Sequence, residues 1–153
     1  MFNLFSTYEC KIDDKGRVLL PTRLKSELAP YIADVFILKR SVFDGCLEFW
    51  PKSEWEKETA EISKLNRFNR QNVEFIRKYV AGLKTVELDG TGRLLIPKDL
   101  IAFAGIEKDI VISGVGDKVE IWDKVKYEAY LKSGENFEPL AETVMGSLRN
   151  QTT

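Results

Sequence analysis

The chain has 153 residues, of which 44% are apolar and 31% are charged, and its formal net charge at pH 7 is −1. This composition is typical of a globular protein with one compact domain. The sequence has no histidine and only two cysteines, which excludes Ser-His-Asp and Cys-His catalysis and argues against a zinc site. We therefore expect no enzyme activity, no metal and no cofactor.

No apolar run reaches the roughly 18 residues that a membrane helix requires, although residues 100–106 form one of the longest runs. Residues 1–10 do not combine a basic stretch with an apolar core, so no signal peptide is visible. We expect a cytoplasmic protein without a membrane partner.

The first elements in chain order are two strands around a turn. Residues 7–12 alternate apolar and polar side chains, which predicts a half-buried strand. Residues 17–20 predict a second strand, which we expect to form a hairpin with the first. Gly16 suits the positive φ angle of such a turn, and the Asp13 carboxylate can accept hydrogen bonds from the turn amides.

A short helix and a second hairpin follow. Thr22 is expected to cap a helix that carries Leu24 and Leu28 on its apolar face. Residues 35–39 and 46–50 are apolar segments with strand character, and the loop between them contains glycine. They predict a hairpin.

Two helices are expected in the middle of the chain. Ser53 and Glu56 have the spacing of a capping box, which predicts a helix start there. Trp55, Ile62 and Leu65 then recur at helical spacing and predict its core-facing stripe.

Asn69 is expected to cap the second of these helices, and Gly82 is expected to close it. Phe75 and Tyr79 lie on a second face of this helix. They form either a buried aromatic pair within the chain or a contact between subunits, and we favour the subunit contact. The core-facing residues of this helix are expected to be Val73, Ile76 and Val80.

The same order of elements then returns. Strands are expected at 85–88, 93–96, 110–113 and 118–122, with a short helix through Leu100 that ends near Gly105. "DDKGRVLLP" at 13–21 and "DGTGRLLIP" at 89–97 lie 76 positions apart. Farther on, "CLEFWPKSEW" at 46–55 resembles "KVEIWDKVKY" at 118–127. The chain is therefore a duplication of one unit.

The strands that follow the two turns are apolar on consecutive residues, at 18–20 and at 94–96. A strand with one solvent-exposed face alternates apolar and polar residues. We therefore expect both faces of these strands to be covered, by the core on one side and by a helix or a neighbouring subunit on the other.

The C-terminal segment begins at Asp123, which can cap a helix ending at Gly134. That helix carries Tyr127, Tyr130 and Leu131. Residues 135–153 permit a loose helix through Leu140, Val144 and Leu148, with mobility as the alternative.

Charge is unevenly distributed along the chain. Residues 11–25 and 63–84 are basic, whereas residues 44–62 are acidic. Because screening limits exposed charges to a range of about 8 Å at physiological salt, local clusters matter more than the sum. The pattern fits either separate basic and acidic faces or a mixed solvated surface.

Each turn has an aspartate four residues before an arginine: Asp13 and Arg17, then Asp89 and Arg93. The pair either fixes the shape of the turn or bridges subunits, or it aims the guanidinium outward at a phosphate or a guanine edge. Lys15 at the tip of the first turn favours DNA contact there. The second turn has threonine in that place.

The paired turns, together with "PKSEWEKETAEISKL" at 51–65, resemble the MraZ family over about residues 1–131. The resemblance implies an α+β fold, mainly β, in which two swapped-hairpin modules of the SpoVT/AbrB type form a double-split β-barrel. We expect module 1 at 5–53, connecting helices at 54–82, module 2 at 83–125, and a C-terminal helix and tail at 126–153.

The resemblance also implies function. It implies a ring-like homo-oligomer that binds short direct repeats of double-stranded DNA and regulates the bacterial division and cell-wall gene cluster, in association with the nucleoid. Arg17, Lys15 and Arg93 are the expected DNA-binding residues. The expected turn-shaping or subunit-contact residues are Asp13, Gly16, Asp89 and Gly92. The alternative is a protein-binding scaffold that regulates through a partner protein.

Overall fold

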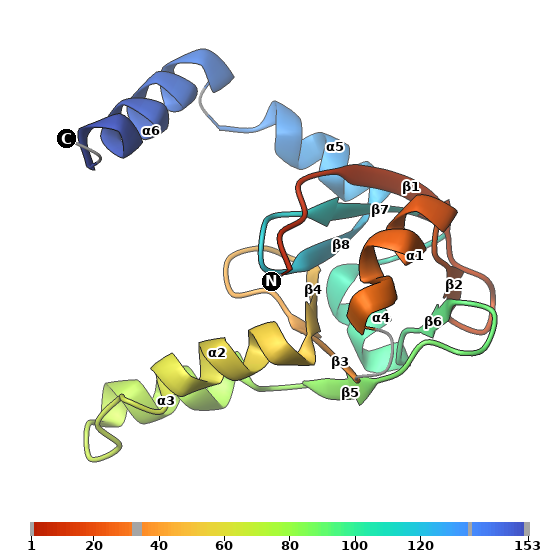
Figure 1. Ribbon diagram of the computed structural model, residues 1–153, viewed down its shortest axis with the longest axis horizontal. Coiled ribbons are helices and arrows are strands. Elements are labelled where there is room, and N and C mark those ends of the chain that lie inside the picture. The colour runs from red at the N-terminus through yellow and green to blue at the C-terminus, as the bar shows by residue number, and fades with distance from the viewer. Residues whose placement is uncertain (1, 32–34, 135, 152–153) are drawn as a thin grey trace.

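The computed structural model describes residues 2–31, 35–134 and 136–151 and has an α+β fold (Figure 1). The strands are β1 (Thr7–Lys11), β2 (Arg17–Leu19), β3 (Phe36–Arg40), β4 (Leu47–Pro51), β5 (Lys84–Val86), β6 (Arg93–Leu95), β7 (Asp109–Gly114) and β8 (Val119–Asp123). The helices are α1 (Thr22–Leu28), α2 (Lys52–Ile62), α3 (Arg70–Tyr79), α4 (Lys98–Ala104), α5 (Lys124–Lys132) and α6 (Phe137–Gln151). A 3₁₀ turn spans Ala29–Tyr31.

The strands form two layers whose pairs are all antiparallel. Among the described residues, a six-stranded sheet has the order β1-β7-β8-β4-β3-β5, and a separate two-stranded ribbon pairs β2 with β6. Both layers mix strands from the two copies of the repeat, since β1 pairs with β7 in the sheet and β2 pairs with β6 in the ribbon. The expected hairpin of 35–39 with 46–50 is confirmed as β3 and β4.

The expected hairpin between β1 and β2 is wrong except next to the turn that joins them. Ile12 and Val18 form a single bridge, after which β1 pairs along its length with β7 and β2 pairs with β6. β2 leaves the sheet because it places Val18 and Leu20 over the core, both nearly fully buried. β1 instead forms five residue pairs with the longer β7.

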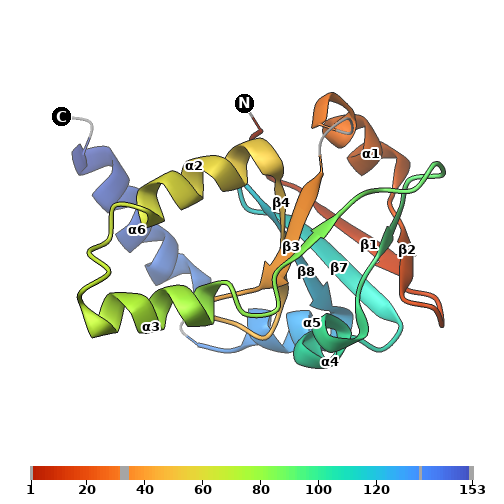
Figure 2. The ribbon, with the colours of Figure 1, turned by 90° about the horizontal axis from the view of Figure 1, so that it is seen from below.

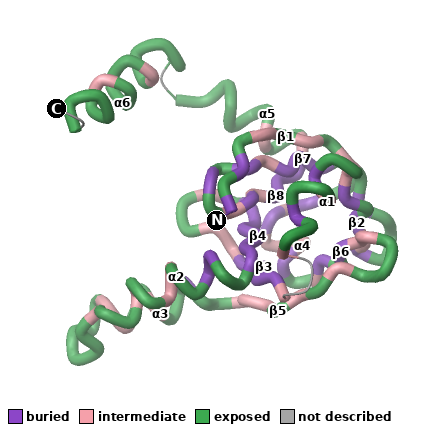
Figure 3. The backbone as a smooth tube through the Cα atoms, in the orientation of Figure 1, coloured by how far each residue is buried: buried purple, intermediate pink, exposed green. Residues whose placement is uncertain are grey.

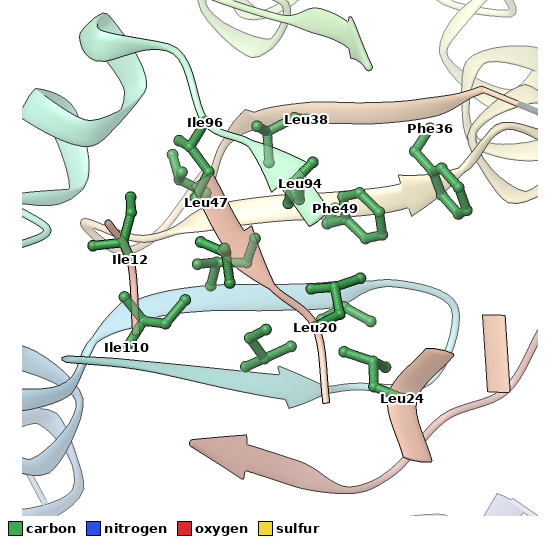
Figure 4. Close-up of a cluster of buried hydrophobic side chains, with 14 of the residues drawn as sticks. Ile12, Leu20, Leu24, Phe36, Leu38, Leu47, Phe49, Leu94, Ile96 and Ile110 are labelled. Atoms are coloured by element: carbon green, nitrogen blue, oxygen red, sulfur yellow. The ribbon is translucent and has the colours of Figure 1, made fainter. Parts of the chain in front are cut away.

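The core lies between the ribbon and the sheet (Figure 4). Leu20, Leu94 and Ile96 come from the ribbon side, whereas Leu38 and Ile110 come from the sheet. Burial of side chains of this size contributes about 1.5–3 kcal/mol each. This two-sided packing fixes the position of the ribbon relative to the sheet.

The outer face of the ribbon is not covered by a helix of the described chain. Leu19 is 55% exposed and Leu95 is 57% exposed, although their neighbours Val18 and Leu94 are buried. Of the two alternatives for the outer face, cover by a helix is therefore wrong, because α1 and α4 pack their leucines Leu24 and Leu100 into the core instead. Cover by a neighbouring subunit stays a prediction.

The helix starts differ from expectation at two places. Pro21 and Pro51 occupy the N-cap positions of α1 and α2, and neither cap makes a side-chain hydrogen bond. Thr22 is already helical, and so is Ser53, so neither residue is a cap. Proline is the start signal here because its fixed φ angle leads into the first helical turn. Asn69 does cap α3, accepting bonds from two backbone amides, as predicted.

α2 and α3 form a helical arm that projects from the body (Figure 2). Tyr79 is buried at the base of this arm, where its ring stacks on Trp55 at 5.8 Å and on Phe75 at 5.2 Å. The predicted subunit contact is therefore wrong for Tyr79, whereas Phe75 remains 42% exposed. Val80, expected in the core, is also exposed because the arm packs on the sheet through the Tyr79 face.

The C-terminal part of the chain contains the expected helix after Asp123 and a second helix, which was one of the two alternatives for residues 135–153. Asp123 caps α5 by accepting a hydrogen bond from the Lys126 amide. α6 covers most of the expected segment 135–153, of which residues 135, 152 and 153 lie outside the described part. None of the described residues of α6 is buried (Figure 3). No helix in the described ranges is long and apolar enough to cross a bilayer.

The two turn glycines are expected to tolerate alanine to different degrees. Gly16 and Gly92 have φ angles of 83° and 80°, where a side chain costs about 1–2 kcal/mol. A Cβ on Gly16 would lie 2.8 Å from the Ile96 carbonyl oxygen, whereas a Cβ on Gly92 would meet only the flexible side chain of Lys25. In urea denaturation we therefore expect Gly16→Ala to lower the free energy of unfolding more than Gly92→Ala. Equal losses would contradict this account.

Candidate functional site

The first turn is organised by the Asp13 carboxylate. Its Oδ1 accepts hydrogen bonds from the backbone amides of Lys15 and Arg17, both at 2.9 Å. Its Oδ2 accepts a hydrogen bond from Arg17 Nε at 2.8 Å. Both uses considered for this pair are therefore compatible: Asp13 shapes the turn, and by holding Nε it orients the guanidinium of Arg17.

The second turn repeats this geometry. Asp89 Oδ1 accepts from the Thr91 and Arg93 amides at 2.9 Å each, and Oδ2 accepts from Arg93 Nε at 2.9 Å. The Arg17 side chain is 35% exposed and the Arg93 side chain is 37% exposed. Within the described residues, the hydrogen bonds and ion pairs of both arginines use Nε and leave the two Nη atoms without a protein partner. Each turn thus presents the same edge of a guanidinium.

The fold brings the two turns to opposite ends of one ribbon. Val18 pairs with Leu94 at its centre, and the strands run antiparallel. The Ile96 amide donates to the Gly16 carbonyl at 2.8 Å, and the Leu20 amide donates to the Gly92 carbonyl at 3.3 Å, so each turn is tied to the end of the other copy's strand. The two turns are therefore held by one rigid element.

Both arginines lie on the same surface, the outer face of the ribbon. Arg17 lies opposite Leu95 and Arg93 lies opposite Leu19, and these four residues share the outer face because the buried Val18 and Leu94 point the other way. Arg17 and Arg93 also line one open pocket of about 500 Å³. Figures 1 and 2 both show the ribbon at the end of the molecule opposite α2, α3 and α6.

The charges at the tips of the turns differ. Lys15 stands at the tip of the first turn, whereas Thr91 in the second turn donates its hydroxyl to Asp89 at 2.8 Å. A lysine from α1 lies beside the second turn: a Cβ built on Gly92 would be 3.4 Å from Lys25 Nζ. The matching position in α4 is Ile101, which packs against Gly16. A lysine therefore lies at or beside each turn, Lys15 at the first and Lys25 at the second, from different parts of the repeat.

Sequence reasoning did not select Lys25 as a site residue. The sequence does contain a signal for Lys25. The 76-residue offset of the repeat aligns Lys15 with Thr91 and Lys25 with Ile101, so the first copy has a lysine at both of these positions and the second copy at neither. It also did not select Lys11 and Lys108, which line the pocket with the two arginines. Those cations are partly balanced by three acids on the same pocket, Asp13, Asp14 and Glu107.

Hydrogen bonds stabilise the ionised form of both turn carboxylates. Hydrogen bonds from the Arg17 amide and side chain and from the Lys15 amide lower the pKa of Asp13. The Arg93 amide and, next in effect, the Thr91 hydroxyl lower the pKa of Asp89. A depressed carboxyl pKa stabilises the turn above the unfolded value of about 3.9 and loses that effect as the pH falls through the folded value. Both turns should therefore keep their shape throughout the neutral range.

We expect Thr91→Val to raise the pKa of Asp89 toward its ordinary value, because valine removes the hydroxyl donor and keeps the backbone amide. Carboxyl carbon chemical shifts followed against pH by NMR would measure this. Asp13 in the same variant is the internal control and should titrate as in the unsubstituted protein. An Asp89 pKa that does not move would show that the backbone amides and the Arg93 guanidinium depress it without help from the hydroxyl.

The second pair of matching segments, at 46–55 and 118–127, has a structural role. Trp50 Nε1 donates to Glu48 at 3.1 Å, and Trp122 Nε1 donates to Glu120 at 3.2 Å. Glu48 and Glu120 face each other across β4 and β8. Glu48 also pairs with Lys39, which is fully buried, at 3.4 Å. Each motif is thus a tryptophan held by a carboxylate two residues earlier on the same strand.

The fold and the site define a duplicated α+β protein that presents two arginine-bearing turns on one β-ribbon. The chain belongs to the MraZ family: residues 4–78 and 80–147 match the family model described as "MraZ protein, putative antitoxin-like".

Curated relatives named "Transcriptional regulator MraZ" align along nearly the whole chain. The protein of Christiangramia forsetii is 55% identical over 148 residues, covering 96% of each chain. That of Flavobacterium psychrophilum is 48% identical over 151 residues, covering 98% of this chain and 96% of the relative. That of Cytophaga hutchinsonii is 39% identical over 145 residues, covering 94% and 95%.

Proposed function

We propose that the chain is a sequence-specific DNA-binding transcriptional regulator, not an enzyme. The observation that carries this proposal is the pair of equivalent guanidinium groups on one exposed ribbon, Arg17 and Arg93. The name of the relatives, transcriptional regulator, supports the same conclusion.

The chemistry of the turns suits a DNA edge. With Nε held by an aspartate, the remaining Nη pair of each arginine can donate two parallel hydrogen bonds to a phosphate or to guanine N7 and O6. Asp13, Gly16, Asp89 and Gly92 act as turn-shaping residues. Arg17 and Lys15 lead the contacts at one end of the ribbon.

Arg93 and Lys25 form the corresponding pair at the other end. Lys25 gives this second turn the cation that Thr91 does not supply. The ammonium groups of Lys15 and Lys25 contact phosphates, whereas the arginines reach the base edges. Phosphate contacts position the protein on the duplex, and base contacts provide the sequence preference.

Self-assembly into a ring is part of the proposal. A single site with nearly balanced charge binds weakly, but several sites on one particle bind repeated DNA sequences by effective concentration. α6 supports assembly because its apolar side chains are exposed in the single chain, as is Phe75 on the arm. α6 has an acidic first half and α3 carries three cations against one acid, so contacts between copies can be complementary in charge.

We further propose that the sheet and the ribbon are the two parts of a double-split barrel of swapped hairpins, with modules at 5–53 and 83–125, connecting helices at 54–82 and a C-terminal part at 126–153. The exchange of strands between the copies supports the swapped arrangement. The proposed setting is the cytoplasm and nucleoid, on direct repeats before the division and cell-wall genes.

The salt dependence of binding tests the proposed function. We expect the logarithm of affinity for the DNA upstream of the chain's own coding sequence to fall linearly with the logarithm of salt concentration, with a slope of about −0.9 per phosphate contacted. Fluorescence anisotropy measures the slope, and Lys25→Ala should make it shallower. A flat profile would contradict the proposed function. Stoichiometric recovery of one protein, with no shift of the DNA, would favour the scaffold alternative.

A further inference from the structure

The outer face of the ribbon pairs each arginine with a leucine. Leu95 lies directly opposite Arg17, and Leu19 lies directly opposite Arg93. Side chains in such positions have Cβ atoms about 5 Å apart. Both leucines are more than half exposed, in contrast to the buried Val18 and Leu94 between them.

A ligand that covers this face must therefore match two properties at once. It must offer hydrogen-bond acceptors to the free Nη atoms and, within about 5 Å, an apolar group to each leucine. A bare phosphate offers only acceptors. The major-groove edge of DNA offers both, because guanine presents N7 and O6 while thymine presents a 5-methyl group.

The shape of the element fits the same ligand. The major groove is about 12 Å wide and admits a two-stranded β-ribbon. The ribbon has three residue pairs and an arginine-bearing turn at each end, which brings cations to the phosphates on both sides of the groove. Lys15 lies at one end and Lys25 at the other.

Resting on the proposed DNA-binding function, we infer that Leu19 and Leu95 are specificity-determining residues that read thymine methyl groups next to the guanines bound by Arg93 and Arg17. Each arginine–leucine pair then selects a guanine with a neighbouring thymine. The approximate two-fold symmetry of the ribbon about the Val18–Leu94 pair places one such reader at each end.

Replacing thymine by deoxyuridine tests the inference because it removes the 5-methyl group and leaves base pairing intact. The probe is the DNA segment upstream of the chain's own coding sequence, prepared with either nucleotide. We expect the full chain to bind the uracil form about fourfold more weakly for each thymine methyl group that packs on a leucine. Leu19→Ala should weaken binding to thymine DNA and reduce this preference, and Leu19→Ala/Leu95→Ala should abolish it.

Leu131→Ala is the matched control, because Leu131 is an exposed leucine on α5, outside both the ribbon and α6, and its loss should leave the preference intact. Equal affinity of the unsubstituted chain for both DNAs would overturn the inference while leaving the proposed function in place. Absence of binding to either DNA would overturn both. A Leu19→Ala variant that keeps the preference but changes particle mass in light scattering would assign Leu19 to a subunit contact and overturn the inference as well.

Discussion

Arg17→Ala is expected to reduce affinity for the upstream DNA by about 10- to 100-fold, the effect of removing one bidentate pair of hydrogen bonds to a base. Asp13 accepts from Arg17 Nε, so within the described residues the two Nη atoms have no protein partner; alanine removes them while Asp13 keeps its bonds to the backbone amides. If the particle carries several copies, every copy lacks these hydrogen bonds, so the observed effect on repeated sites is larger. Fluorescence anisotropy at fixed salt measures the change.

Arg67→Ala is the control for this variant, because Arg67 is an exposed arginine in the turn between α2 and α3, on the arm remote from the ribbon. It should leave DNA affinity almost unchanged. The thermal unfolding midpoint of Arg17→Ala should stay close to that of the unsubstituted chain, since the pair with Asp13 is solvent-exposed. A large drop in that midpoint with unaltered DNA affinity would give the arginine a purely structural role.

Lys39→Met should have the largest effect on stability, a loss of about 3–5 kcal/mol, because it leaves the buried Glu48 without its cation. Lys39 is fully buried, donates to the Arg40 carbonyl at 2.6 Å and lies 4.1 Å from the centre of the Tyr79 ring. Burial lowers the pKa of Lys39, whereas Glu48 counteracts this effect. Urea denaturation measures the loss.

Two further variants define the origin of that loss. Lys39→Met/Glu48→Gln should recover most of it, because the amide still accepts from Trp50 and no unpaired charge remains. Lys78→Met removes an exposed ion pair to Glu74 and should cost about 0.5 kcal/mol or less. If Lys39→Met and Lys78→Met cost the same, burial of the pair would not be the cause.

The turns could be predicted from local sequence. An aspartate that bonds the amides two and four residues later and a glycine at positive φ require only neighbouring residues, and both turns formed as expected. Asn69 and Asp123 could be predicted as caps for the same reason. The apolar positions Leu24, Leu28 and Leu100 are buried as their spacing indicates.

Residues that act across the fold could not be predicted in this way. Lys25 reaches the second turn only because α1 of one copy packs beside the turn of the other. The exposure of Leu19 and Leu95 depends on which strand lies beside β2, and an apolar run carries no information about that neighbour. The prediction for Tyr79 is wrong because α3 packs on α2 and β3, which its helical spacing alone does not reveal.

Short-range chemistry in this sequence was sufficient to define a duplicated unit and two arginine-bearing turns. The pairing of β1 with β7 and of β2 with β6, and with it the meeting of both turns on one ribbon, was decided only in the folded chain. The physical reason is that alternation along a strand specifies which face is buried but not which strand becomes its neighbour. That neighbour is selected by the packing of Val18, Leu20, Leu94 and Ile96 into one shared core.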